Sequence, residues 1–92
     1  NRLHRVENRC SRWLLMVHTQ AGRDNFMLTQ EFLSQMLAVR RASVQSAASA
    51  LQKAGLIEYR RGKLTIRDRA GLEKASCECY RIIQQEIENI FA

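Results

Sequence analysis

Apolar residues recur every three or four positions over the first twenty residues of the chain. Between residues 3 and 21 these positions are Leu3, Val6, Cys10, Trp13, Leu14 and Val17. Since an α-helix turns once in about 3.6 residues, this spacing places all of them on one side of a helix. The pattern predicts an amphipathic helix from Leu3 to Ala21, ended by a turn at residues 22–25. Trp13 lies within the apolar stripe and is interpreted as a core residue rather than a stacking platform.

Two more helices are expected in the middle of the chain. Residues 26–28 predict a short strand or an extended lead-in, and Thr29 after them is a suitable N-cap for a helix from Gln30 to Leu37. Another helix is predicted from about Arg41 to Ala54, and Gly55 would end it as a left-handed C-cap. The buried stripe of this helix is expected to comprise Val44, Ala47, Ala48 and Leu51.

A hairpin and a last helix complete the predicted order. Residues 56–59 and 64–66 are short apolar runs separated by a Gly-containing tight turn, which is typical of a β-hairpin. Asp68 can cap a helix from about Arg69 to Phe91. The apolar positions of that helix are Leu72, Ala75, Cys79, Ile82, Ile83, Ile87 and Ile90. The predicted fold class is mainly α with a small β-hairpin.

The two central helices are joined by a very short turn, which restricts the residues that can lie where they cross. Ser34 is small where the helices must approach each other, and Ala38 is small at the turn. This spacing is typical of a helix-turn-helix, whose second helix enters the DNA major groove. Most such turns carry Gly where this chain has Ala38. The hairpin that follows would be a wing, so we expect a winged helix-turn-helix.

Length and charge agree with a small domain that binds a polyanion. With 92 residues and 46% apolar content, the chain has room for one folded domain, residues 1–92, and no apolar run approaches the roughly 20 residues of a membrane span. Because it begins without Met, we expect it to be a fragment of a longer protein. The net charge is +6, with +8 over residues 1–69 and −2 over residues 70–92. The polyanion-binding surface is therefore expected before residue 70.

The sequence offers no chemistry for catalysis or for a metal. It has no Gly-rich phosphate loop, no paired carboxylates in an expected cleft and no Cys–His pair that the predicted helices bring together, so we predict that it is not an enzyme. Three cysteines without a secretory signal indicate reduced thiols in a cytosol-like compartment. Cys77 and Cys79 would point about 200° apart on a helix, so they could not share a metal ion. We expect Cys77 to be an exposed thiol and Cys79 a core residue.

Candidate DNA-binding residues lie on the helix-turn-helix and on the wing. Arg40 and Arg41 stand at the start of the predicted recognition helix, about residues 41–54, where phosphates and guanine edges are both within reach. Gln45 and Ser46 lie on its outward face, which carries no acidic residue, and the wing, residues 58–66, would contact the DNA backbone. The full predicted set is Thr29, Gln30, Arg40, Arg41, Ser43, Gln45, Ser46, Arg60, Arg61 and Lys63. The alternative function is a winged-helix protein-interaction module that does not bind DNA.

Several stretches resemble one known family of bacterial regulators. They are residues 29–33, 40–44, 51–57 and 68–80, which include Asp68-Arg-Ala-Gly-Leu-Glu73 and Cys77-Glu-Cys-Tyr80. Over about residues 8–91 the chain resembles the C-terminal winged-helix domain of Crp/Fnr-family transcriptional regulators. The resemblance implies a cytoplasmic homodimer that binds a palindromic double-stranded DNA operator and works with RNA polymerase. It also implies an N-terminal sensor domain, absent from these residues, whose effector is unknown, and no cofactor in this domain.

The recognition helix departs from the pattern of that family. Its members commonly carry Arg, Glu and a second Arg there, and Arg41 matches the first, but Ala42 replaces the Glu and Ser46 replaces the second Arg. Alanine offers only apolar contact to a thymine methyl group, and serine a hydrogen bond that does not select one base. The operator of the family therefore cannot be transferred to this chain. The apolar residues Leu15, Met16, Ile90 and Phe91 exceed the needs of a small core, and we expect some to meet the sensor domain or a second protomer.

Overall fold

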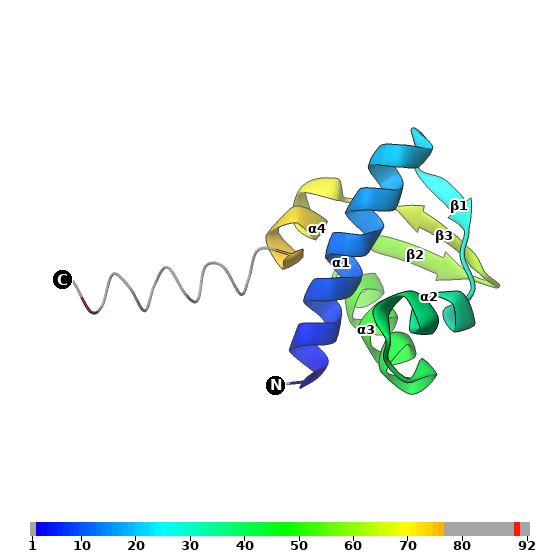
Figure 1. The fold of residues 1–92 in the computed structure, drawn as a ribbon. Coiled ribbons are helices and arrows are strands. Elements are labelled where there is room, and N and C mark those ends of the chain that lie inside the picture. The colour runs from blue at the N-terminus through cyan, green and yellow to red at the C-terminus, as the bar shows by residue number, and fades with distance from the viewer. Residues whose placement is uncertain (1, 77–89, 91–92) are drawn as a thin grey trace.

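The computed structural model describes residues 2–76 and residue 90, and within them the predicted order of elements is confirmed (Figure 1). The helices are α1 (Arg2–Ala21), α2 (Gln30–Leu37), α3 (Arg41–Lys53) and α4 (Arg69–Ser76). The strands are β1 (Asn25–Met27), β2 (Ile57–Arg60) and β3 (Lys63–Ile66). The predicted continuation of the last helix beyond Ser76, with Cys77 and Cys79, lies outside the described residues. No helix within the described residues is long and apolar enough to span a membrane.

The three strands form one antiparallel sheet in the order β1-β3-β2. The β2–β3 hairpin is the predicted wing, and its register pairs Arg60 with Lys63 across the turn. The strand or lead-in predicted at residues 26–28 is the strand β1 at residues 25–27, which pairs with β3 through Phe26 and Leu64. This pairing was not predicted, because three residues are too few to show the alternation of a strand. Strand β3 of the wing is therefore paired on both edges, with β2 inside the hairpin and with β1, which precedes the helix-turn-helix.

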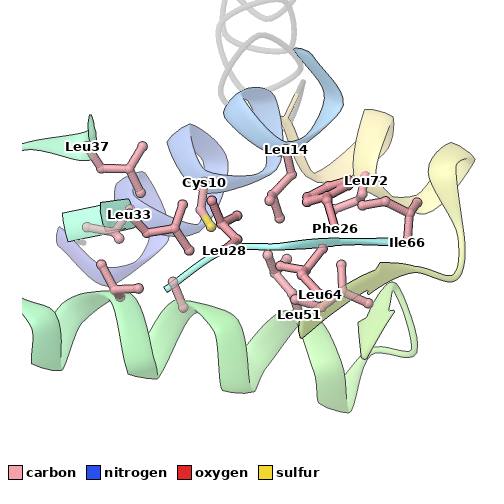
Figure 2. Packing of buried hydrophobic residues seen from close by; sticks show 14 residues of the cluster. Cys10, Leu14, Phe26, Leu28, Leu33, Leu37, Leu51, Leu64, Ile66 and Leu72 are labelled. Carbon is pink, nitrogen blue, oxygen red and sulfur yellow. The ribbon is translucent and has the colours of Figure 1, made fainter. Parts of the chain in front are cut away.

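The core lies where α1 crosses α3 and α4, with the sheet closing one side (Figures 1 and 2). The deepest side chains come from different elements, since Leu14, Leu33, Leu64 and Leu72 are all fully buried. Cys10 is buried among them, as the α1 stripe predicted, and this burial raises the pKa of its thiol to about 12. A thiol in that environment is a small apolar core residue at neutral pH.

Two apolar residues of α1 that were expected to exceed the needs of the core behave differently. Leu15 is half-buried and packs against the core, so it is not surplus. Met16 is exposed, as expected. Trp13 is half-buried, with one edge against the core and its ring in edge-to-face contact with Phe32 of α2.

Candidate nucleic-acid interface

The turn between α2 and α3 determines where the recognition helix starts. Thr29 caps α2 as predicted, with its hydroxyl oxygen accepting the Phe32 amide at 3.1 Å. Ala38 follows α2 in the left-handed conformation, with φ 55°, and Val39 then donates its amide to the Ser34 carbonyl at 3.0 Å. This arrangement of bonds is a Schellman motif, which reverses the chain within a few residues. Arg40 is therefore the extended residue before α3, and Arg41 is its first helical residue.

The turn of the wing projects its cations into solvent. Arg61 and Gly62 are its two central residues, both with positive φ, at 50° and 79°. This combination is characteristic of a type I′ turn, whose twist matches that of the flanking strands. Arg60, Arg61 and Lys63 are exposed and line one hollow at the tip of the hairpin. The predicted basic tip is thus a continuous cationic surface.

Hydrogen bonds tie the wing to the rest of the domain. The Leu28 amide donates to the Gly62 carbonyl at 2.6 Å, and the Tyr59 hydroxyl donates to the Leu28 carbonyl. The Tyr59 amide in turn donates to the side-chain oxygen of Gln52 on α3 at 2.7 Å. Since Leu28 leads directly into the Thr29 cap, the wing, the start of α2 and the end of α3 form one connected unit.

One hollow brings together predicted residues from the start of α2, the start of α3 and the wing. Thr29 and Gln30 from the start of α2, Arg41 from α3 and Arg61 from the wing line it together with Tyr59 and Gly62. Arg41 and Arg61 are twenty positions apart in the sequence, so the fold itself creates this pair of guanidinium groups. No carboxylate of a described residue lines the hollow. An anion with several oxygens, such as a backbone phosphate, fits this chemistry.

The outward face of α3 is shallow and free of acidic side chains. It is lined by Ala42, Gln45, Ser46, Ser49, Ala50 and Lys53. The members that the sequence placed outward, including Gln45 and Ser46, are exposed, while Val44 and Ala47 are buried beneath them. Small and amide side chains on a slightly hollowed helix face allow close approach to base edges.

A second basic groove lies on the side of α3 away from the wing. Two of its cations, Arg5 and Arg9, were not among the predicted site residues. Arg40 and Ser43 line a groove together with Arg5 and Arg9 of α1. The Arg9 guanidinium also donates to the Leu37 carbonyl at the end of α2, which fixes α1 against the turn. Arg5 and Arg9 are four residues apart and share one helix face, and that basic pair was the available signal. The α3 face therefore lies between two basic surfaces.

The carboxylate of the wing itself, Glu58, is paired with a cation. Glu58 of β2 accepts a hydrogen bond from the Arg67 guanidinium, and this bond, with the nearby charges of Arg67, Arg60 and Lys63, lowers the pKa of the carboxyl group. A partner anion at the wing tip therefore meets little repulsion from this side chain.

Across residues 2–76 and 90, no three His, Cys, Asp or Glu side chains come close enough to hold a metal ion.

A helix-turn-helix followed by a basic β-hairpin, with no acidic side chain on the outward face of its second helix, is the arrangement of the winged helix-turn-helix class of DNA-binding domains. Residues 8–75 match the family described as the Crp-like helix-turn-helix domain, and the chain belongs to this family of transcription-regulator domains. A comparison with curated protein sequences finds no match.

Solved structures of Crp/Fnr regulators share the fold. A putative transcriptional regulator of the Crp/Fnr family from Eubacterium rectale is 27% identical, with a TM-score of 0.73 over 76% of this chain and 32% of that one. The catabolite activator protein of Thermus thermophilus is 23% identical, with a TM-score of 0.75 over 80% of this chain and 35% of that one. The present chain thus spans about a third of the length of these structures.

Proposed function

We propose that this chain binds double-stranded DNA in a sequence-specific manner and regulates transcription, with α3 in the major groove and the β2–β3 wing on the backbone. The observation that carries the proposal is the convergence of Arg41 and Arg61 on one hollow beside the outward face of α3, which carries no acidic side chain. A protein-interaction module has no need to place cations from the recognition helix and the wing side by side. Duplex DNA supplies phosphates next to the base edges that such a helix reads.

The residues of α3 divide into readers and anchors in this proposal. Arg41 lies at the start of the helix, where a guanidinium can donate to guanine O6 and N7 together. Gln45 and Ser46 on the exposed face read further base edges, and Ala42 offers a methyl contact to thymine. The operator therefore differs from that of regulators with Glu and a second Arg at these positions.

Phosphate contacts flank these readers on both sides. On one side they come from Arg60, Arg61 and Lys63 of the wing, together with Thr29 and Gln30 at the start of α2. On the other side they come from Arg40 and Ser43, joined by Arg5 and Arg9 of α1. Contacts of this kind position a helix in the groove without reading sequence.

The larger protein is proposed on the length of its relatives. Since the chain spans about a third of the matched regulators, we infer a longer bacterial, cytoplasmic protein with a sensor domain before this one. A homodimer would place two α3 helices on half-sites about 34–36 Å apart in a palindromic operator. RNA polymerase is the expected partner at the promoter, and the effector of the sensor is left open.

The test compares Arg41→Ala with Arg61→Ala by fluorescence anisotropy on a panel of duplexes chosen by selection from a random pool. Arg61→Ala should weaken binding about equally on all duplexes and lower the log–log salt slope by about one unit. Arg41→Ala should cost about 1–3 kcal/mol and relax the preference at one base pair of each half-site.

Other outcomes would change the assignment. An equal loss on every duplex for Arg41→Ala would make Arg41 a phosphate anchor and leave base readout to Gln45 and Ser46. Binding by the unaltered chain that does not weaken as salt rises would contradict DNA binding altogether, and would favour the protein-interaction alternative.

A further inference from the structure

Exposed apolar side chains gather on the surface shared by α1 and α2, away from the outward face of α3. Met16 of α1 is 55% exposed, and Phe32 and Met36 of α2 are 43% and 48% exposed. Trp13 joins them through its edge-to-face contact with Phe32, with ring centroids 6.0 Å apart. Within the described residues only Met27 and Ile90 are comparable exposed large apolar residues. We call Trp13, Met16, Phe32 and Met36 the α1–α2 apolar face.

A hollow of about 290 Å³ opens in this face, lined by Trp13, Met16, Met36, Leu37, Arg9 and Arg12. It is at the lower limit of small-molecule sites, which enclose roughly 300–1,000 Å³, and its size suits one or two anchoring side chains of a protein partner. Among the described residues, both charged groups that line it are guanidinium groups, and none is a carboxylate. The Arg12 side chain is exposed, and no described residue pairs with it. The hollow is therefore apolar with a cationic rim.

We propose that the α1–α2 apolar face is a docking site for an acidic amphipathic helix of another protein. The apolar stripe of that helix fills the hollow, and flanking Asp or Glu side chains pair with the exposed Arg12. Met16 and Met36 have flexible side chains that adapt to such an anchor. The hollow shares Arg9 with the groove of Arg5, Arg40 and Ser43, but this guanidinium is already held by the Leu37 carbonyl. The α1–α2 apolar face shares no residue with the outward face of α3 or with the hollow between α3 and the wing, so an occupant leaves both of them open.

The chain carries its own reporter, because Trp13 is its single tryptophan. The probe is a synthetic helical peptide of about four turns, with Leu along one stripe and Glu beside it, and its control carries Lys in place of each Glu. We expect the Glu peptide to shift the Trp13 emission saturably at low salt, and to bind at least about tenfold more tightly than the Lys peptide. Equal binding of both peptides, or no saturable shift, would overturn the proposal.

Variants locate the binding to this face. Met36→Gln should weaken the Glu peptide about tenfold, while Met27→Gln, a change at a methionine of β1 that is 73% exposed, should leave it unchanged. Arg12→Glu should reverse the preference between the two peptides. Circular dichroism melts of these variants should coincide with that of the unaltered chain, since all three positions are exposed. Equal weakening by Met36→Gln and Met27→Gln would show that the peptide binds elsewhere.

A second copy of the chain is the competing occupant, and sedimentation distinguishes it. Without peptide, the chain should sediment as a monomer at micromolar concentration. Self-association that Met36→Gln abolishes would mean that this face pairs with itself, and the proposal would be wrong.

Discussion

Ala38 holds a backbone conformation that an alanine rarely adopts. Its φ of 55° lies in the left-handed region, which costs an L-residue with a Cβ roughly 1–2 kcal/mol. The turn tolerates this because the Ala38 and Val39 amides close the end of α2 on the Gln35 and Ser34 carbonyls. A strained residue therefore stands just before the recognition helix.

We expect Ala38→Gly to stabilise the domain by about 0.5–1 kcal/mol, the relief of strain being partly offset by the greater entropy of glycine in the unfolded chain. The matched control is Ala54→Gly, since Ala54 ends α3 with an ordinary φ of −76° and should lose stability on the same change. Urea unfolding of the two variants measures both. A loss of stability in Ala38→Gly would contradict the assignment of strain.

In the proposed complex, Arg61 has two opposing effects, since its charge would favour DNA binding while its φ of 50° disfavours folding. Asn is favoured at this position of a type I′ turn. Arg61→Asn should therefore raise the free energy of unfolding by about 0.5 kcal/mol while it weakens DNA binding. As a control, Arg60→Asn removes a charge from an extended strand residue. It should lower both the free energy of unfolding and the affinity for DNA. Calorimetry measures the stability of the two variants, and fluorescence anisotropy measures their affinity for DNA. If stability and affinity change in the same direction in both variants, Arg61 does not exchange stability for affinity.

At the scale of elements, the start of α4 depends on Gly71. Asp68 accepts the Gly71 amide at 3.0 Å and so caps the helix. A Cβ at position 71 would lie 2.3 Å from the Leu56 side chain and 2.7 Å from the Asp68 carboxylate. The family-like stretch Asp68–Glu73 thus has a packing reason, because it brings α4 close against the chain that enters the wing.

Gly71→Ala should destabilise the domain by about 1–3 kcal/mol, because Leu56 or the cap must move to admit the methyl group. Lys74→Ala on the exposed side of the same helix should change stability by no more than about 0.5 kcal/mol. Thermal melts followed by circular dichroism compare the two. Coinciding melts would show that the Asp68 cap and Leu56 adjust without cost.

The limits of these elements were predictable where a local signal fixes them, as at Thr29 and Gly55. What the sequence could not supply were relations between distant segments. The pairing of β1 with β3 depends on a register that three residues do not encode, and the approach of Arg5 to Arg40 depends on how α1 crosses α3. For the same reason Met16 was recognised as surplus but Phe32 and Met36 were not, since an eight-residue helix shows too little periodicity to reveal its exposed side.

At the scale of the whole molecule, the +8 charge of residues 1–69 is distributed on both sides of α3. If the α1 flank contacts DNA, Arg5→Gln should lower the log–log salt slope by about 0.9, the share of one phosphate. Arg23→Gln, in the turn that follows the far end of α1, removes the same charge and should leave the slope nearly unchanged. Identical slopes for the two variants would mean that only net charge matters.

The hydrogen bonds that connect Leu28, Gly62, Tyr59 and Gln52 lower the entropy cost of DNA binding in the proposed complex. A wing on a free loop would have to be ordered at the moment of contact, and each immobilised residue would reduce the affinity. Here the hairpin is held in place before DNA arrives, by hydrogen bonds to Gln52 of α3 and to Leu28, which leads into α2. The domain therefore meets the duplex as a rigid body, and the entropy cost of arranging its contacts is met during folding.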